Sequence, residues 1–141
     1  MSSLENRIVL ITGASSGIGL AAARMFAEEG ATVVLAARNQ ERLSEVEKEF
    51  KSKGYRFLVK QCDVRKSKEV DSLVQGAGSQ FGKIDILDNN AGTALYGLVD
   101  ETPDEALQDN LEVNLLGTLR CTRAVIPGMR KQQWGRIINI G

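Results

Sequence analysis

Apolar runs and amphipathic stretches alternate along the whole chain. The apolar runs cover residues 7–12, 31–36, 55–61, 84–88 and 136–140. Helical patterns lie between them at residues 18–29, 40–53, 67–80 and 103–126. Runs rich in Val, Ile and Leu without polar alternation are typical of strands buried on both faces, so helices must cover both sides of the sheet. The order of elements therefore predicts an α/β fold, with a doubly wound parallel sheet in a three-layer αβα arrangement.

A glycine-rich segment joins the first predicted strand to the first helical pattern. Residues 13–19 read Gly-Ala-Ser-Ser-Gly-Ile-Gly, and glycines here allow a sharp reversal and a close approach of the backbone to a pyrophosphate. The N-terminus of the following helix favours an anion through its free N–H groups and its dipole. Similar turns occur in proteins that bind nothing, but this one lies inside a complete βαβ unit. The predicted phosphate site consists of Gly13, Ser15, Ser16, Gly17, Ile18 and Gly19.

Charged residues follow the second and third predicted strands. Arg38 can fork onto the 2′-phosphate of an adenosine ribose, and a charge-assisted hydrogen bond of about 1.5–3 kcal/mol favours NADP over NAD. The alternative is a surface arginine near a helix N-terminus. Asp63, which is followed by Val64, either accepts a hydrogen bond from an adenine amino group or caps the next segment. Both interpretations of Asp63 stay open.

Small and amide residues follow the fourth predicted strand. Asn90, Ala91 and Gly92 lie at the carboxyl edge of the sheet, where open α/β folds bind their ligands. Small side chains at this edge leave room for a flat ring. A hydrogen-bonded turn is the alternative, because asparagine and glycine are common turn residues.

The last helical pattern carries one polar residue among apolar ones. Asn114 is placed on an inward stripe formed by Leu107, Leu111, Leu115, Thr118 and Val125. A buried amide needs hydrogen-bond partners, so it either bonds to a neighbouring strand or points into a ligand cleft. Val113 and Leu116 are expected to be exposed, and the fifth strand has an open edge, which together predict dimerisation or aggregation. A homo-oligomer is therefore expected.

Composition and charge narrow the classes of function. The chain has 141 residues, enough for one domain, and its 18 basic residues balance 18 acidic ones. Because the charges balance, the protein as a whole has no electrostatic potential that would attract nucleic acid or an anionic membrane. No apolar stretch is long enough to span a bilayer, and residues 1–6 lack a signal pattern, so a cytoplasmic location is expected.

Cysteine and histidine usage argues against a metal site. The chain contains no histidine, and Cys62 and Cys121 lie far apart without a CxxC spacing. Familiar zinc sites and His-based triads are therefore not expected, and no metal is predicted. Both cysteines are expected to be buried packing residues.

Four segments of the sequence resemble, in order and spacing, the motifs of the short-chain dehydrogenase/reductase family. These segments are residues 12–19, Asp63-Val64, residues 89–92 and Val113-Asn114. The resemblance covers the whole chain and implies a Rossmann-type sheet with strand order 3-2-1-4-5. It implies NADP bound by the glycine segment, Arg38, Asp63-Val64 and Asn90-Ala91-Gly92, with hydride passing to or from a small-molecule carbonyl or alcohol substrate. It further implies that Asn114 is the asparagine of the catalytic tetrad, whose main chain holds a water in a proton relay to a lysine.

The sequence departs from the family in two places. Asp88 stands where an apolar residue is usual, and a carboxylate there would need a partner or a raised pKa. Residues 135–141 resemble the strand that leads to the catalytic serine, and neither Tyr55 nor Tyr96 has a lysine four residues later.

From the second departure we expect an incomplete NADP-binding domain over residues 1–141: the N-terminal part of an NADP-dependent oxidoreductase, inactive by itself. The alternative is a complete short protein that binds a dinucleotide without catalysis, as a sensor or an interaction module.

Overall fold

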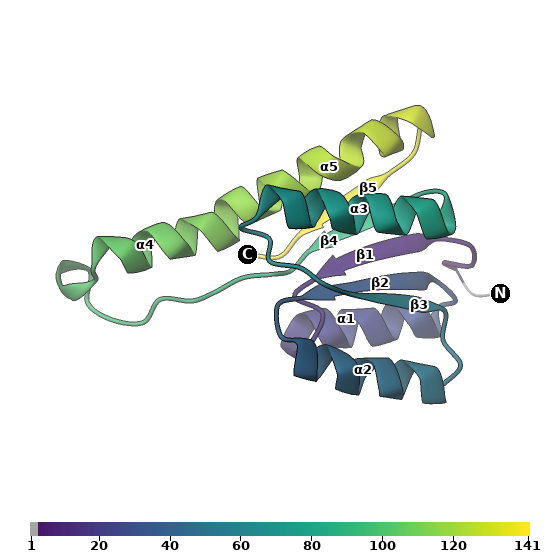
Figure 1. Cartoon of the computed structure of the whole chain (residues 1–141), viewed down its shortest axis with the longest axis horizontal. Helices are drawn as coiled ribbons and strands as arrows, with labels where there is room; N and C mark the ends of the chain where they lie inside the picture. Colours follow the sequence, from purple (N-terminus) through teal and green to yellow (C-terminus); the bar gives the residue numbers. More distant parts are fainter. Residues whose placement is uncertain (1–2) are drawn as a thin grey trace.

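The fold is built on one parallel sheet. The computed structural model describes residues 3–141; residues 1 and 2, part of the N-terminal segment considered above for a signal, lie outside the described residues. The strand order is β3-β2-β1-β4-β5, as predicted (Figure 1). The strands are β1 (Ile8–Thr12), β2 (Thr32–Ala37), β3 (Phe57–Gln61), β4 (Ile86–Asn89) and β5 (Arg136–Asn139).

Helices cover both faces of this sheet. On one face lie α1 (Gly17–Glu28) and α2 (Gln40–Ser52), and on the other lie α3 (Ser67–Phe81) and α5 (Thr118–Lys131) (Figure 1). A 3-10 turn, η1 (Val99–Glu101), and the helix α4 (Asp104–Leu111) follow β4. A π-helical segment, η2 (Glu112–Gly117), joins α4 to α5. In Figure 1, α4 and the loop before it extend beyond the sheet.

The core consists of two apolar layers, one on each face of the sheet. Because side chains alternate along a strand, Leu10 of β1 joins the layer under α3 and α5, while Val9 and Ile11 join the layer under α1. All residues of β1 and β2 are buried, which explains their continuous apolar runs. This arrangement confirms the predicted three-layer αβα fold.

The last helical pattern is longer than the sequence indicated. It was predicted to end at residue 126, but helix α5 continues to Lys131 and includes Pro127. Proline removes one N–H donor from a helix. Pro127 is exposed, so solvent can satisfy the carbonyl that loses its partner.

The predicted inward stripe of this helical stretch is wrong, except at Val125. Leu111 and Leu115 are 55% and 51% exposed, and Asn114 is exposed as well. The buried residues are Val113, Gly117, Cys121, Val125 and Met129. Packing of small residues sets this face, because a Cβ built on Gly117 would lie 3.1 Å from Val64 Cβ. Val113 was expected to be exposed and is buried, whereas Leu116 is 36% exposed.

Candidate nucleotide-binding cleft

A cleft of about 870 Å³ lies at the carboxyl edge of the sheet. It brings together every predicted cofactor-binding residue except Gly19. The predicted residues that line it are Gly13, Ser15, Ser16, Gly17, Ile18, Arg38, Asp63, Val64, Asn90, Ala91 and Gly92. The cleft has further lining residues that the sequence patterns did not indicate, namely Ala37, Asn39, Arg42, Cys62 and Val113.

The glycine segment needs its glycines for different reasons. Gly13 and Gly17 have φ angles of 65° and 55°, in the left-handed region that favours glycine. A Cβ on Gly19 would collide with Asn90 Nδ2 and Gly13 O, so Gly19 packs the loop rather than facing the cleft. A Cβ on Gly17 would meet nothing within 4 Å, which leaves open space beside the start of α1.

The N-terminus of α1 is suited to an anion. Ser16 precedes the helix, its side chain makes no capping hydrogen bond, and the first turn of α1 contains no acidic residue. The first N–H groups of a helix have no partners within the helix. These groups and the positive end of the helix dipole therefore remain available to a phosphate in the cleft.

Thr12 and Asn90 join the glycine segment to the turn after β4. Thr12 Oγ1 accepts hydrogen bonds from the main-chain N–H groups of Asn90 and Ala91, at 3.1 and 3.0 Å. Asn90 Nδ2 donates to Thr12 O at 3.2 Å and to Gly13 O at 3.3 Å. The side-chain amide of Asn90 thus positions the loop, and Ala91 and Gly92 provide the small surface of the cleft.

Asp63 is held by an arginine two residues later. Its Oδ1 accepts from the main-chain N–H of Arg65 at 3.0 Å, and its Oδ2 lies 2.7 Å from Arg65 Nη2. The Arg65 guanidinium lowers the pKa of Asp63, mainly through this side-chain hydrogen bond. Arg65 Nη1 also lies 2.6 Å from Asp109 Oδ1 of α4. Asp63 therefore holds the turn that precedes α3, and its carboxylate also lines the cleft, so its adenine-binding role stays a prediction.

Asn114 lies in η2 and is bound to the loop after β4. Its Oδ1 accepts from the N–H of Thr93 at 2.8 Å, and its Nδ2 donates to Thr93 O at 2.7 Å. Its main-chain oxygen accepts from Thr118 Oγ1 at 3.0 Å. Of the two alternatives considered above, the side chain bonds to a neighbouring segment, which is a loop rather than a strand.

Asp88 is buried without a full set of partners. The residue is 3% exposed, and its Oδ1 has no hydrogen-bond partner among residues 3–141. Burial raises the pKa of Asp88 above its ordinary value. A carboxylate at this position needs a partner or a raised pKa, and the structure has the second.

The two cysteines are buried and unpaired by disulfide, as predicted. Burial raises the pKa of Cys62 to about 11 and that of Cys121 to about 12. Within the described part of the chain, no group of three His, Cys, Asp or Glu side chains could hold a metal ion. No helix in residues 3–141 is long and apolar enough to cross a membrane.

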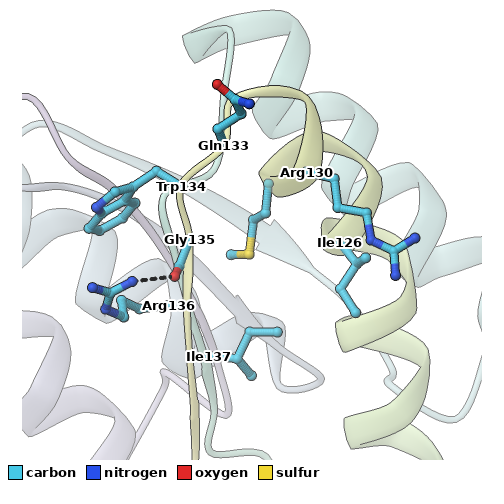
Figure 2. Close-up of a pocket in the computed structure, with 8 residues that line it drawn as sticks. Ile126, Arg130, Gln133, Trp134, Gly135, Arg136 and Ile137 are labelled. Carbon is cyan, nitrogen blue, oxygen red and sulfur yellow. Dashed lines mark hydrogen bonds between the residues drawn. The ribbon is translucent and has the colours of Figure 1, made fainter.

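A second hollow of about 590 Å³ lies between the C-terminal half of α5 and β5 (Figure 2). Apolar side chains of Ile126, Met129, Trp134 and Ile137 line it, together with Arg130 and Arg136. None of the predicted site residues contributes to this hollow.

A doubly wound sheet with a glycine-loop cleft at its carboxyl edge defines the class of nucleotide-binding α/β proteins. Within this class, the chain belongs to the short chain dehydrogenase family, whose family model matches residues 7–141. Members of this family are oxidoreductases that bind NAD(P) and act on small molecules.

Relatives and solved structures agree with this assignment. A putative ketoacyl reductase of Streptomyces coelicolor is 39% identical over 142 residues, covering 99% of this chain and 54% of that protein. A variant of actinorhodin polyketide ketoreductase crystallised with NADPH is 38% identical with a TM-score of 0.92, covering 100% of this chain and 54% of its own. An NAD+-bound xylitol dehydrogenase is 35% identical with a TM-score of 0.93, covering 97% and 53%. The chain therefore spans about half the length of these relatives.

Proposed function

We propose that this chain is the NADP(H)-binding portion of a short-chain oxidoreductase that transfers hydride between the nicotinamide and a carbonyl or alcohol carbon. The observation that supports this best is the cleft, in which the glycine segment, Arg38, Asp63-Val64 and residues 90–92 face one space. Its volume of about 870 Å³ falls in the usual range for cofactor sites. When bound, the cofactor supplies the hydride or accepts it.

Each part of the cleft has a proposed role. The first N–H groups of α1 bind the diphosphate, because their charge is unopposed by acidic residues in that turn. Arg38 binds the ribose 2′-phosphate, which favours NADP over NAD. Asp63 accepts from the adenine amino group in place of one of the hydrogen bonds that Arg65 donates to its carboxylate. Ala91 and Gly92 leave space for the nicotinamide ring.

Asn114 is proposed to act through its main chain. In the π-helical turn, the Asn114 carbonyl oxygen accepts a hydrogen bond from the Thr118 hydroxyl. The same oxygen can accept a second hydrogen bond from a water of a proton relay. The Asn114 side chain holds Thr93 and so positions the loop that follows the nicotinamide subsite.

Cofactor binding is tested by calorimetric titration of the 141-residue chain with NADPH and NADH. We expect saturable heat with NADPH and weaker binding of NADH. No heat with either cofactor, from a sample shown to be folded by circular dichroism, would contradict the proposed function.

Turnover is a separate matter. No tyrosine in the 141 residues is followed four positions later by lysine, and we propose that the chain binds cofactor without completing hydride transfer. Consumption of NADPH with a simple ketone by the purified chain would contradict this part of the proposal.

We also propose that the chain forms homo-oligomers through the exposed side of α4, η2 and α5. Four leucines recur there at intervals of four residues and are 40–55% exposed, namely Leu107, Leu111, Leu115 and Leu119. A row of exposed leucines is an association surface in water. Sedimentation equilibrium should give a mass above that of the 15.3 kDa monomer, and Leu115→Glu should reduce it; a monomeric parent chain would refute the proposal.

A further inference from the structure

The start of α2 directs a second arginine to the cleft. Arg38 follows the last residue of β2, and Arg42 is the third residue of α2; both line the cleft that faces the glycine segment. The main chain beneath them is fixed, because Gln61 Nε2 donates to Arg38 O at 2.9 Å and Asn39 Oδ1 accepts from Arg42 N at 2.9 Å. The Asn39 side chain is thus used by the helix cap, and the two guanidinium groups remain for a ligand.

Neither guanidinium forms an ion pair within the described residues, although the charge of Arg38 contributes to lowering the pKa of Asp63. Among residues 3–141, no carboxylate lies within 4 Å of the guanidinium of Arg38 or Arg42, whereas Arg24 and Arg65 each contact a carboxylate at 2.8 Å or less. Two cations at the N-terminal end of a helix are disfavoured by the helix dipole and by their mutual repulsion. An anion at this point reverses both effects, since it is attracted by the helix N-terminus and by each arginine.

We propose that Arg42 is a second specificity-determining residue, which binds the 2′-phosphate of NADP(H) together with Arg38. This inference rests on the proposed function and extends it. A phosphate monoester carries about −1.5 to −2 charges at neutral pH and three acceptor oxygens, so it can occupy two guanidinium forks at once. The 2′-hydroxyl of NAD(H) carries no charge, so Arg42 contributes to the binding of NADP(H) and not to that of NAD(H).

The test compares NADPH and NADH binding to single and double variants of the whole chain. Arg42→Ala should weaken NADPH binding by about tenfold, which is the loss of one charge-assisted contact, and should change NADH binding by less than about twofold. Arg42→Lys should restore part of the loss, because it keeps the charge but not the planar fork. The double variant with Arg38→Ala should lose NADPH selectivity altogether.

Arg56→Ala is the matched control. Arg56 is exposed and lies before the other end of β3, away from the cleft, so this variant removes the same charge without touching the site. It should bind both cofactors as the parent chain does. The Arg42 substitutions leave the main-chain cap intact and the side chain is exposed, so the variants should fold.

Each remaining outcome has a distinct meaning. If the parent chain binds NADPH selectively and Arg42→Ala binds it equally well, the inference is wrong and the proposed function stands. An equal loss for NADPH and NADH, or a parent chain without selectivity, also overturns the inference. If the parent chain binds neither cofactor, the proposed function itself fails.

Discussion

Replacement of Asp88 tests what an incompletely paired buried carboxyl costs this fold. We expect Asp88→Val to increase the free energy of unfolding by about 1–3 kcal/mol, the usual penalty for a buried polar atom without a partner. Asp88 is 3% exposed and its Oδ1 is unpaired among the described residues. Valine suits a strand position, and the main-chain oxygen that accepts from Thr12 Oγ1 at 3.4 Å is retained.

The gain should depend on pH in a defined direction. Burial raises the pKa of Asp88 in the folded state above its ordinary value of 3.8, so the folded protein keeps this proton to higher pH than the unfolded chain. The stability associated with the protonated group is fully present below the ordinary pKa and is lost as the pH rises through the raised pKa. The advantage of the variant should therefore grow as the pH increases above about 4.

Urea unfolding followed by circular dichroism, repeated from acid to neutral pH, measures both effects. A change of 1 kcal/mol corresponds to about 2–4 °C in Tm for a domain approaching 150 residues. Asp85→Val is the control, since Asp85 is 2% exposed but accepts from Ile8 N at 2.8 Å and contacts Arg7 and Lys83. The free energy of unfolding of the Asp85→Val variant should fall by about 3–5 kcal/mol. A variant of Asp88 no more stable than the parent at neutral pH, with a parallel pH profile, would refute the reasoning.

Three further results are expected. Gly19→Ala should abolish NADPH binding in a titration and lower Tm, because its Cβ would collide with two atoms of the site. Gly78→Ala is the contrasting variant: its Cβ would meet nothing within 4 Å, so it should stabilise α3 by about 0.5–1 kcal/mol. Arg65→Ala should reduce the free energy of unfolding in urea by about 1–3 kcal/mol. It should also raise the pKa of Asp63, and an unchanged pKa of Asp63 by NMR would argue against this ion pair. Cys62 and Cys121 should resist thiol reagents at pH 8 until the chain is unfolded, and rapid labelling of the native protein would contradict their burial.

The sheet and the glycine segment could be predicted because local signals determine them. Strands buried on both faces are continuous apolar runs, and alternation with helices leaves few possible topologies. The cleft followed from the same logic, since residues such as Gly13, Arg38 and Asn90 come directly after strands whose carboxyl ends share one edge.

Other parts of the site depend on tertiary contacts that have no local signal. The face of the α4–α5 stretch was assigned from its leucines, but the close approach of Gly117 to Val64 decides which side is buried. The contact between Arg65 and Asp109 was missed because these residues lie 44 positions apart, whereas the pairing of Arg65 with Asp63, two residues earlier, could have been noticed. Arg42 could have been noticed, since a basic residue in the first turn of a helix opposes the helix dipole.

The π-helical segment η2 lies between α4 and α5. Six residues there form a wider turn. The helix α5 packs on the sheet and buries Cys121, Val125 and Met129, whereas α4 extends beyond the sheet and buries none of its residues. Removing one residue from η2 would rewind its six residues as five residues of α-helix, which keeps α4 and α5 in nearly the same phase but changes the direction of the side chains within η2. The Asn114 side chain would then point away from Thr93. The position of the loop beside the cleft therefore depends on the π-helical turn as well as on the Asn114 amide.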